Sequence, residues 1–447
     1  MACSNIKKKY RAHKIFLTCF SIFVSSFLFA QENDSLLQVA TLDNCIQYAL
    51  VHNPDINNAK LNEDITESMI KGKLADWYPQ INFSYNLQHN FQLTTANFNG
   101  TLIHSGTVNS SGLDFGATQN IFNRDVLLAS KSANDVRLSA SQNTSDQKIN
   151  LGVAVSKAFY NLILTMQQLK VAEEDIVRNT QSLKDATYQY QAGIVDKTDY
   201  MQATIALNNS KATQRTAAEA IIAKAAYLKD LMGYPDAAEL MPAYDSTKME
   251  QEIYLDTLQQ VDYSSRIEIQ QLETQKKLQQ YNLQYYKLGY LPNLYAYGNY
   301  NMNYLNNEAS KLYNNTYPNS FAGITLSLPL FQGGKRIQQV KQAQLEITQV
   351  DNNIQSQQNV INSQFQIAMS TYKSQLYNYY SLKENLSLAN EVYDVIQLQY
   401  RSGVKAFLDV ITAEVALRNA QINYLNALYQ VLSSKIDVEQ TLGKISY

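Results

Sequence analysis

Two stretches of the chain decide the fold, Tyr190-Gln-Ala-Gly193-Ile-Val-Asp-Lys-Thr-Asp199-Tyr-Met-Gln-Ala203 and Tyr400-Arg-Ser-Gly403-Val-Lys-Ala-Phe-Leu-Asp409-Val-Ile-Thr-Ala413. Their Tyr, Gly, Asp and Ala residues match at a single offset of 210 positions. Each glycine stands between two long segments without helix breakers, and glycine suits the left-handed backbone conformation just past a helix end. The two stretches therefore predict two helical hairpins that turn at Gly193 and Gly403.

The likeness between the two halves of the chain extends outward from these stretches. Further matches occur in the same order and at nearly the same offset: Trp77-Tyr-Pro79-Gln-Ile81 with Tyr290-Leu-Pro292-Asn-Leu294, Phe122 with Phe331, and Met232-Gly233 with Leu442-Gly443. Ordered matches over most of the chain predict two structural repeats. We place them at residues 31–233 and 261–443, with a linker or equatorial element at 234–260 and a C-terminal tail at 444–447.

The composition favours long helices and excludes several classes of protein. Gly (15) and Pro (7) make up about 5% of the 447 residues, less than half of the roughly 12% that is usual. Charged residues are only 17%, whereas Tyr numbers 32 and Asn and Gln number 42 each, so the polar surface is largely uncharged. Collagen, a disulfide scaffold and a highly charged disordered chain are excluded. A net charge of -2 gives no reason to expect a nucleic-acid partner.

Each half shows the same predicted order of elements, a helix, two strands, a very long helix and a return helix. In the first half these are 42–75, about 80–90 and 111–122, 124–192, and 199–232. In the second half they are 261–287, about 293–303 and 320–331, 335–402, and 407–441. Asn53-Pro54 interrupts the first helix, because proline disfavours helix in the residue before it.

The predicted strands alternate between apolar and polar residues with a period of two. Ile81, Phe83 and Tyr85 interleave with Asn82 and Ser84. The apolar sets of the other strands are Leu113, Phe115, Ala117 and Ile121; Leu294, Ala296, Gly298, Tyr300 and Met302; and Ala322, Ile324, Leu326, Leu328 and Leu330. Each run is about 10 residues long, which suffices to cross a bilayer as a tilted strand. A soluble hairpin with one wet face is the alternative, and residues 91–110 and 304–319 are predicted to be long loops.

The long helices require partner helices along their whole length. Residues 124–192 contain no Pro and one Gly, Gly152, and at 1.5 Å per residue such a helix would be about 100 Å long. Apolar residues recur at spacings of three and four, as in a coiled coil: Val155, Phe159, Leu162, Met166, Leu169, Ile176, Leu183 and Tyr190. We expect this stripe to be the packing seam.

The N-terminus, residues 1–30, is predicted to be a secretory signal peptide. It begins with five basic residues: Lys7, Lys8, Lys9, Arg11 and Lys14. An apolar segment of about 15 residues follows, with Ala30 as a small residue for cleavage. A signal anchor would need about 20 apolar residues, and lipid attachment at Cys19 is a weaker alternative because Thr18 is not small. Cleavage would change the net charge from -2 to -7 and leave Cys45 as the one cysteine.

No catalytic, cofactor-binding or metal-binding pattern occurs in the sequence, so we expect neither an enzyme nor a cofactor or metal. The histidines of the mature chain, His52, His89 and His104, fall in a helix end, a strand and a loop. Gly333-Gly334-Lys335 precedes a helix, but Arg336 stands where a phosphate-binding loop needs Ser or Thr. We interpret this segment as a turn.

Two motifs give the chain a resemblance to the TolC-like outer-membrane efflux family, the outer membrane factors. Thr41-Leu-Asp-Asn-Cys-Ile-Gln-Tyr-Ala49-Leu50-Val-His-Asn53-Pro54-Asp55 resembles the N-terminal signature of that family, Leu…Ala-Leu-x-x-Asn-Pro. The pattern Tyr400…Gly403…Asp409-Val410 is similar to its periplasmic tip. The likeness covers nearly all of residues 41–443.

The resemblance implies a mainly α-helical homotrimer in the outer membrane that extends into the periplasm. Each protomer would give four strands to one 12-stranded β-barrel, and the coiled-coil hairpins would form an α-barrel tunnel closed at its tip. The expected partners are a periplasmic adaptor (membrane fusion protein), an inner-membrane pump and outer-membrane lipid. The implied function is passive conduction of small molecules, as the exit duct of a tripartite efflux system. Type I protein secretion is a close alternative, and a secreted non-channel coiled-coil or adhesion protein is an alternative from another class.

The resemblance also places an entrance constriction at the hairpin tips. Asp409 matches the first acidic position of that constriction, where three copies would form an acidic ring that favours cations. The second family acid falls on Thr412, which makes the ring less acidic. The plainer interpretation of Asp409 is an acid that caps the return helix.

Four further residues match positions that tie neighbouring hairpins shut in the family: Tyr400, Lys405, Thr198 and Asp199. The family has Arg where this chain has Lys405, so a bidentate fork is replaced by a point charge. The plainer interpretation is that these are solvated tip residues that contribute little to stability.

Overall fold

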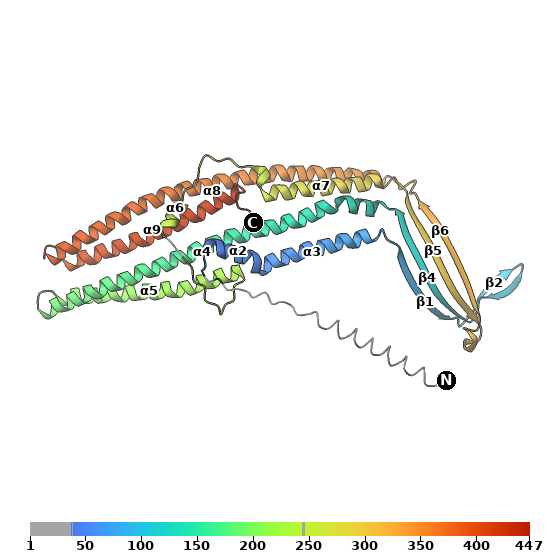
Figure 1. Cartoon of the computed structure of the whole chain (residues 1–447), viewed down its shortest axis with the longest axis horizontal. Coiled ribbons are helices and arrows are strands. Elements are labelled where there is room, and N and C mark those ends of the chain that lie inside the picture. The colour runs from blue at the N-terminus through green and yellow to red at the C-terminus, as the bar shows by residue number, and fades with distance from the viewer. Residues whose placement is uncertain (1–36, 38, 244–245) are drawn as a thin grey trace, which may run out of the picture.

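The computed structural model describes residues 37, 39–243 and 246–447. The predicted signal peptide, with Cys19, lies outside the described residues. The described chain is elongated and mainly helical. Long helices run side by side through most of its length, a small antiparallel sheet lies at one end, and the helical turns lie at the other (Figure 1).

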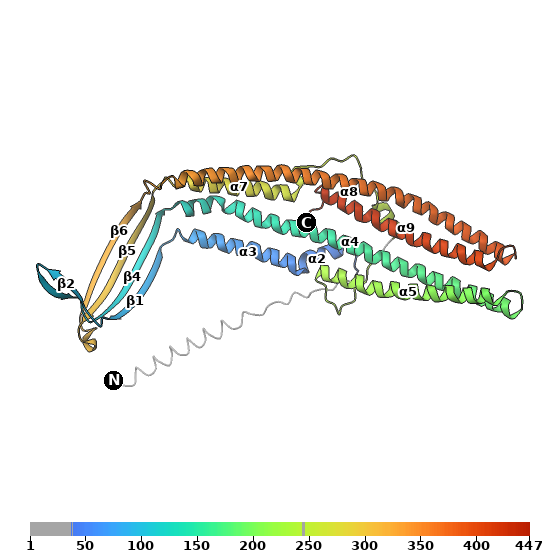
Figure 2. The same cartoon turned by 180° about the vertical axis from the view of Figure 1, so that it is seen from behind.

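The elements of the first half begin with a helix pair and end with a helical hairpin: α2 (Leu42–His52), α3 (Pro54–Ala75), β1 (Gln80–His89), β2 (Thr94–Phe98), β3 (Thr101–Ser105), β4 (Asn109–Phe122), α4 (Arg124–Gln191) and α5 (Lys197–Met232). Helix α6 (Ser246–Glu252) lies in the segment between the halves. The elements of the second half are η1 (Tyr263–Ser265), α7 (Ile267–Leu288), β5 (Asn293–Asn306), η2 (Ala309–Lys311), β6 (Thr316–Ser327), α8 (Lys335–Arg401) and α9 (Phe407–Thr441). The hairpins α4–α5 and α8–α9 lie side by side in both views (Figure 2).

The predicted interruption at Asn53-Pro54 separates α2 from α3. Asn53 has an extended backbone, and its side-chain oxygen accepts hydrogen bonds from the N–H groups of Asp55 (2.8 Å) and Ile56 (3.2 Å). Its side-chain amide donates to the carbonyl of Leu231 at 2.8 Å. Asn53 therefore caps α3 and fixes the bend against the end of α5.

Four strands form one antiparallel sheet in the order β1-β4-β5-β6. The register places the predicted apolar sets on one face through neighbouring pairs: Phe83 with Phe115, Phe115 with Tyr300, Leu113 with Met302, Leu294 with Leu326, and Ala296 with Ile324. This face is exposed, with Phe83 at 59% and Ile324 at 69%. The opposite face carries Asn82, Ser84 and Asp114, so the sheet has one apolar and one polar side.

The two predicted long loops are shorter than expected, because both contain strand residues. Residues 91–110 include the hairpin β2–β3, whose two-residue turn is Asn99-Gly100, with φ of +50° and +86°. Asn-Gly is the preferred pair for such a turn. Within 304–319, β5 continues to Asn306 and β6 begins at Thr316. The strand predicted to end at 331 ends at Ser327, two residues before Pro329, which cannot donate to the ladder.

The helix predicted from residue 261 begins at Ile267. The side-chain carboxylate of Asp262 accepts hydrogen bonds from the backbone N–H (2.9 Å) and the hydroxyl (2.7 Å) of Ser264. Such local bonds stabilise a turn in competition with a helix. The turn η1 therefore takes the place of the first helical residues.

The segment of residues 234–260, here called the clasp, packs into the core at the middle of the molecule. Its described part carries buried apolar side chains, namely Tyr234, Met249, Ile253 and Leu255. The hydroxyl of Tyr372 on α8 donates to the carbonyl of Ile253 at 2.8 Å, and Lys435 on α9 donates to the carbonyl of Glu252 at 2.6 Å. The hydroxyl of Tyr160 on α4 donates to the carboxylate of Glu252 at 2.9 Å. The clasp therefore ties helices of both hairpins together.

Within the described residues, α4 contains a segment of 18 residues that is long and apolar enough to cross a membrane. Of that segment, 67% is buried inside the protein. The buried residues Val155, Phe159 and Leu162 belong to the central core. We therefore interpret the segment as the core-facing part of a long packed helix.

The exposed apolar face of the sheet yields a first prediction. Phe83→Arg and Ile324→Arg each place a charge on the face expected to meet lipid, so each should destabilise the membrane-inserted protein by about 2–4 kcal/mol near the bilayer midplane. Asn82→Arg is the matched control, because Asn82 lies one residue from Phe83 on the polar face. The measurement is the yield of folded protein in outer-membrane fractions. Equal yields for all three variants would contradict the assignment of the lipid-facing side.

Candidate functional site

The two hairpin tips are built alike around a glycine with a positive φ, +71° at Gly193 and +74° at Gly403. In the first tip, the N–H of Ile194 donates to the carbonyl of Gln189 at 2.9 Å. In the second tip, Val404 makes the equivalent bond to Gln399, also at 2.9 Å. These bonds are those of a Schellman motif, which closes the end of a helix. The predicted turns are therefore present at both glycines.

Asp409 lies in the first turn of α9 and caps it. Its Oδ2 accepts a hydrogen bond from the N–H of Ala406 at 3.2 Å and lies 3.8 Å from the Nζ of Lys405. Thr412, one turn further along α9, is exposed and donates to the carbonyl of Leu408 at 2.8 Å. The capping interpretation of Asp409 is thus realised within the protomer, and its carboxylate stays partly exposed.

Tyr400 connects the two hairpins. Its hydroxyl donates to the side-chain oxygen of Gln189 on α4 at 2.9 Å, and its ring centroid lies 5.7 Å from that of Phe407. Phe407 is buried in a small cluster with Ala186 and Ala203. Burial raises the pKa of Tyr400, and the nearby carboxylate of Asp199 adds to that rise.

The other predicted tip residues, Asp199, Thr198 and Lys405, do not form a common cluster in the described chain. Asp199 is half-buried at the start of α5, and burial, with a smaller contribution from Asp196, raises its pKa. Thr198 is exposed beside it. In the described chain, the ion pair of Lys405 is made to Asp409 rather than to Asp199. The structure therefore brings Tyr400 toward Asp199, while the tie from Lys405 to Thr198 and Asp199 of a neighbouring hairpin stays a prediction.

The predicted packing seam of α4 is only partly confirmed toward the tip, where Leu183 packs against the cluster of Ala186, Ala203 and Phe407. Ile176 and Leu183 are only half-buried and Tyr190 is 43% exposed. The buried residues there are small or polar and recur at spacings of three and four: Ala172, Asp175, Asn179, Ser182 and Ala186. Small side chains allow close approach of the helices, and the apolar spacing alone did not indicate which stripe faces the partner.

Two buried carboxylates and two half-buried arginines form a charged cluster on this seam, here called the tip cluster: Asp175, Arg178, Glu414 and Arg418. Asp175 is 1% exposed and Glu414 is 4% exposed. Arg178 forms an ion pair with Asp175, and its Nε lies 3.8 Å from Glu414 Oε1. The Nε of Arg418 lies 3.9 Å from Asp175 Oδ2. The apolar pattern of the sequence did not indicate this cluster, although charged residues at seam spacing were an available signal.

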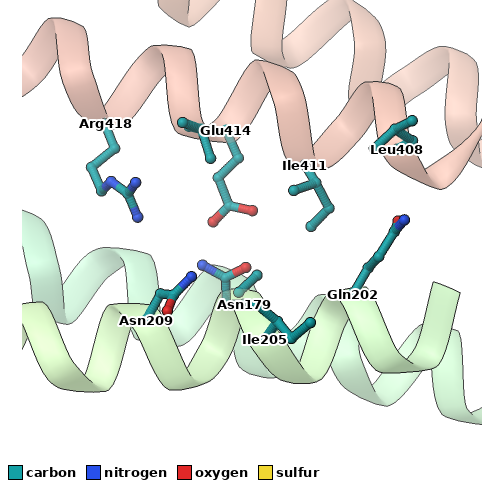
Figure 3. Close-up of a pocket in the computed structure, with 10 residues that line it drawn as sticks. Asn179, Gln202, Ile205, Asn209, Leu408, Ile411, Glu414 and Arg418 are labelled. Atoms are coloured by element: carbon teal, nitrogen blue, oxygen red, sulfur yellow. The ribbon is translucent and has the colours of Figure 1, made fainter. Parts of the chain in front are cut away.

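A cavity of about 220 Å³ adjoins the tip cluster between α5 and α9. Figure 3 shows Glu414 extending from α9 toward Asn179, with Gln202 and Asn209 projecting from α5. The amide of Asn179 donates to the hydroxyl of Ser210 at 3.0 Å, and that hydroxyl donates to the carbonyl of Ala206. The side-chain nitrogen of Asn179 is therefore hydrogen-bonded, whereas its side-chain oxygen takes no part in these bonds.

Among the described residues, neither this Asn179 oxygen nor Glu414 Oε1 has a hydrogen-bond donor. Two acceptors without donors are costly when buried. Burial raises the pKa of Glu414 to about 7, against an opposing effect of Arg178. A proton on Glu414 would supply a donor, and we therefore expect the packing of the two hairpins to depend on pH.

Comparison with known proteins identifies the architecture. The family model described as outer membrane efflux protein matches residues 45–234 and 262–444. The chain belongs to the outer membrane efflux protein family. Membership places this efflux protein in the outer membrane with its helices reaching into the periplasm. The alternative of a secreted adhesion protein is set aside.

Individual relatives of this outer membrane efflux protein are distant in sequence and close in fold. It is 22% identical to the outer membrane protein TolC of Escherichia coli (strain K12) over 428 residues, covering 92% of the chain and 84% of TolC. It is 22% identical to the alkaline protease secretion protein AprF of Pseudomonas aeruginosa over 297 residues, covering 64% of the chain and 60% of AprF. The solved structure of CusC superimposes with a TM-score of 0.71 at 17% identity, covering 90% of this chain and 91% of that one.

The tip cluster yields a pH prediction. The pKa of Glu414 in the packed state, about 7, lies above the ordinary value of 4.5, so the packed hairpins bind the proton more tightly than separated ones. The contribution of Glu414 to the stability of the packed hairpins is fully present below pH 4.5. It is lost as the pH rises through 7 and amounts to about 3 kcal/mol in total. The pKa of Asp175 is also raised by burial, so its contribution has the same sign.

The measurement is the apparent melting temperature of the purified protein at pH 5.5 and pH 8. The wild-type protein should melt at a lower temperature at pH 8, and Glu414→Gln should reduce the difference between the two melting temperatures because an amide does not titrate. Glu391→Gln, an exposed carboxylate on α8, is the control and should retain the wild-type difference. An unchanged difference in Glu414→Gln would rule out proton-linked packing at this site.

Proposed function

We propose that this protein is the exit duct of a tripartite efflux system and conducts small molecules passively across the outer membrane. In this proposal three protomers assemble, and a periplasmic adaptor and an inner-membrane pump supply cargo and energy. The chain acts as a conduit and not as an enzyme. Its residues shape and close the conduit, and no chemical step takes place in it.

The observation that carries this proposal is the form of the sheet. It has an exposed apolar face, and β1 and β6 stand at its two edges. Unpaired backbone groups are costly in lipid, which admits β-structure only as closed barrels. Pairing β6 of one protomer with β1 of the next would close a 12-stranded barrel from three copies. The polar face would then line the lumen.

The gate in this proposal lies at the tips. Both hairpin turns stand at the end opposite the sheet (Figure 1), which would be the periplasmic entrance. Three copies of Asp409 around an axis would form an acidic ring, with Thr412 one turn deeper. Tyr400 would hold the α8–α9 hairpin against α4 through Gln189.

The description of the family favours efflux over protein secretion. AprF is described as an alkaline protease secretion protein, so type I secretion is kept as the second candidate. The two differ in cargo size. Deletion of the gene should raise the accumulation of a small fluorescent dye in cells if the duct serves efflux. A loss of one secreted protein from the medium, with dye accumulation unchanged, would assign the duct to secretion.

A variant with a weakened tip tests both the proposed duct and its proposed gate. The double variant Lys405→Ala with Tyr400→Phe removes the proposed tie from Lys405 to a neighbouring hairpin, an exposed ion pair worth about 0–1 kcal/mol, and the hydrogen bond from Tyr400 to Gln189, worth about 1 kcal/mol. Repeated in three protomers, the loss should open the entrance. Single-channel conductance in planar bilayers should be low for the wild type and several times higher for the double variant, as expected for about 1 kcal/mol or more.

The matched control for this test is Lys373→Ala with Tyr377→Phe, which changes an exposed lysine and an exposed tyrosine on α8 away from the tip. This control should conduct like the wild type. If the tip variant also conducts like the wild type, Tyr400 and Lys405 do not hold the gate. A protein that inserts and never conducts in any variant would contradict the duct itself.

The acidic ring gives a separate prediction. Asp409→Asn keeps an oxygen that can accept the hydrogen bond from Ala406 and removes the charge, so cation selectivity should fall while the melting temperature changes little. Reversal potentials in a salt gradient measure the selectivity. Asp394→Asn, an exposed acid on α8, is the control. Unaltered selectivity combined with a lower melting temperature would leave capping as the role of Asp409.

A further inference from the structure

A second cavity, of about 180 Å³, lies where the strands meet the helices. It is bounded by the C-terminal end of α7, the residues between α7 and β5, the residues after β6 and the first turn of α8. Its lining includes Arg124, Gly289, Gln332, Lys335 and Arg336. Lys335 and Arg336 belong to the Gly-Gly-Lys-Arg segment that the sequence indicated only as a turn.

Three cationic side chains from two different helices meet at this cavity. Arg124 begins α4, and Lys335 and Arg336 begin α8. A Cβ built on the buried Gly289 would collide with Nη1 of Arg124 and come within 3.4 Å of Nε of Arg336. The two guanidinium groups therefore approach the same point, although their charges repel each other.

Tyrosine rings hold both guanidinium groups in place. Arg124 lies 4.3 Å from the ring centroid of Tyr285 and donates to its hydroxyl at 3.2 Å. Arg336 lies 4.3 Å from the ring centroid of Tyr290. Stacking on a ring restricts a guanidinium while leaving its N–H groups free to donate in the ring plane. The site is thus ordered before any ligand binds.

The cavity has an excess of positive charge. In the part of the chain that the structure describes, Arg124 has one ion pair, to Asp125 at 3.6 Å, whereas Lys335 and Arg336 have none. No carboxylate lines the cavity among the described residues. Two planar guanidinium forks and an ammonium, of which only Arg124 has an acidic partner, match the oxygens of a phosphate group.

The position of the cavity indicates where such a phosphate would come from. Exposed aromatic side chains surround this end of the sheet: Trp77 and Tyr78 before β1, Tyr290 before β5, and Phe331 after β6. Aromatic belts of this kind lie at the level of the lipid headgroups. Because the helices extend into the periplasm, this belt belongs to the periplasmic leaflet.

We propose that Arg124, Lys335 and Arg336 form a binding site for the phosphate of an anionic phospholipid headgroup in the periplasmic leaflet. The two stacked guanidinium groups bind the phosphate oxygens, and Lys335 adds charge at the exposed rim. The exposed side chain of Leu291, which also lines the cavity, lies against the lipid. Such a lipid would link the first turns of α4 and α8, the two longest helices of the chain.

Native mass spectrometry of the detergent-purified protein tests this site. The probes are phosphatidylglycerol, phosphatidylcholine and inorganic phosphate, titrated separately. The wild type should bind phosphatidylglycerol more tightly than phosphatidylcholine, and Lys335→Gln with Arg336→Gln should weaken phosphatidylglycerol binding about tenfold. Arg124→Gln, on the other helix, should weaken it in the same direction, so the test survives if one variant fails to fold.

The control is Lys373→Gln with Arg401→Gln, which removes the same charges from exposed positions of α8 far from the sheet. It should bind phosphatidylglycerol like the wild type. Equal weakening by the control and by the site variants would show a general charge effect and overturn the site. Tight binding of inorganic phosphate, with no preference for phosphatidylglycerol over phosphatidylcholine, would overturn the lipid assignment in favour of free phosphate.

Discussion

Backbone hydrogen bonding at the two edges of the sheet is the constraint on which the rest of the structure depends. β1 and β6 each lack a strand partner on one side in the described chain, and an apolar solvent provides no water to replace it. A sheet with this exposed apolar face is unsuited to water, and with open edges it is unsuited to lipid. Pairing of these edges with other copies of the chain, as proposed above, would satisfy both conditions.

The long helices extend away from the sheet, and the side chains that pack between them change along their length. At the middle, large apolar residues such as Phe159 and Leu162 are buried together with the clasp. Toward the tips, the seam of α4 carries Asp175, Asn179 and Ser182 instead. Large apolar contacts resist separation, whereas small polar contacts stabilise less and respond to charge. We therefore expect the apolar middle of the molecule to stay fixed and the tips, with their small polar contacts, to move.

Much of the fold follows from local patterns. The alternation around Phe83 predicted which face of the sheet is apolar, because side chains alternate strictly along a strand. Gly193 and Gly403 predicted the turns, because few other residues adopt a positive φ. The Asn99-Gly100 turn also had a local signal, and it was overlooked inside a segment interpreted as a loop.

The remaining features depend on which distant residues meet, and a single sequence does not contain that information. Burial of Glu414 results from its position opposite Asn179 on another helix, 235 positions away in the chain. The meeting of Arg124 with Arg336 depends in the same way on how α4 and α8 are placed. On a long helix, a shift of the contact line by one residue turns the buried face by about 100° and so buries a different set of residues. Periodicity predicts that a seam exists, and tertiary packing determines which residues form it.

The clasp gives the long helices the mechanics of a lever. It holds α4 near Tyr160, and from there to the tip at Gln191 the helix extends for about 46 Å at 1.5 Å per residue. A rotation of about 5° at this fulcrum would displace the tip by about 4 Å, more than the width of a water molecule. Small rotations at the clasp would thereby become movements of the tip that are large enough to change the width of an opening.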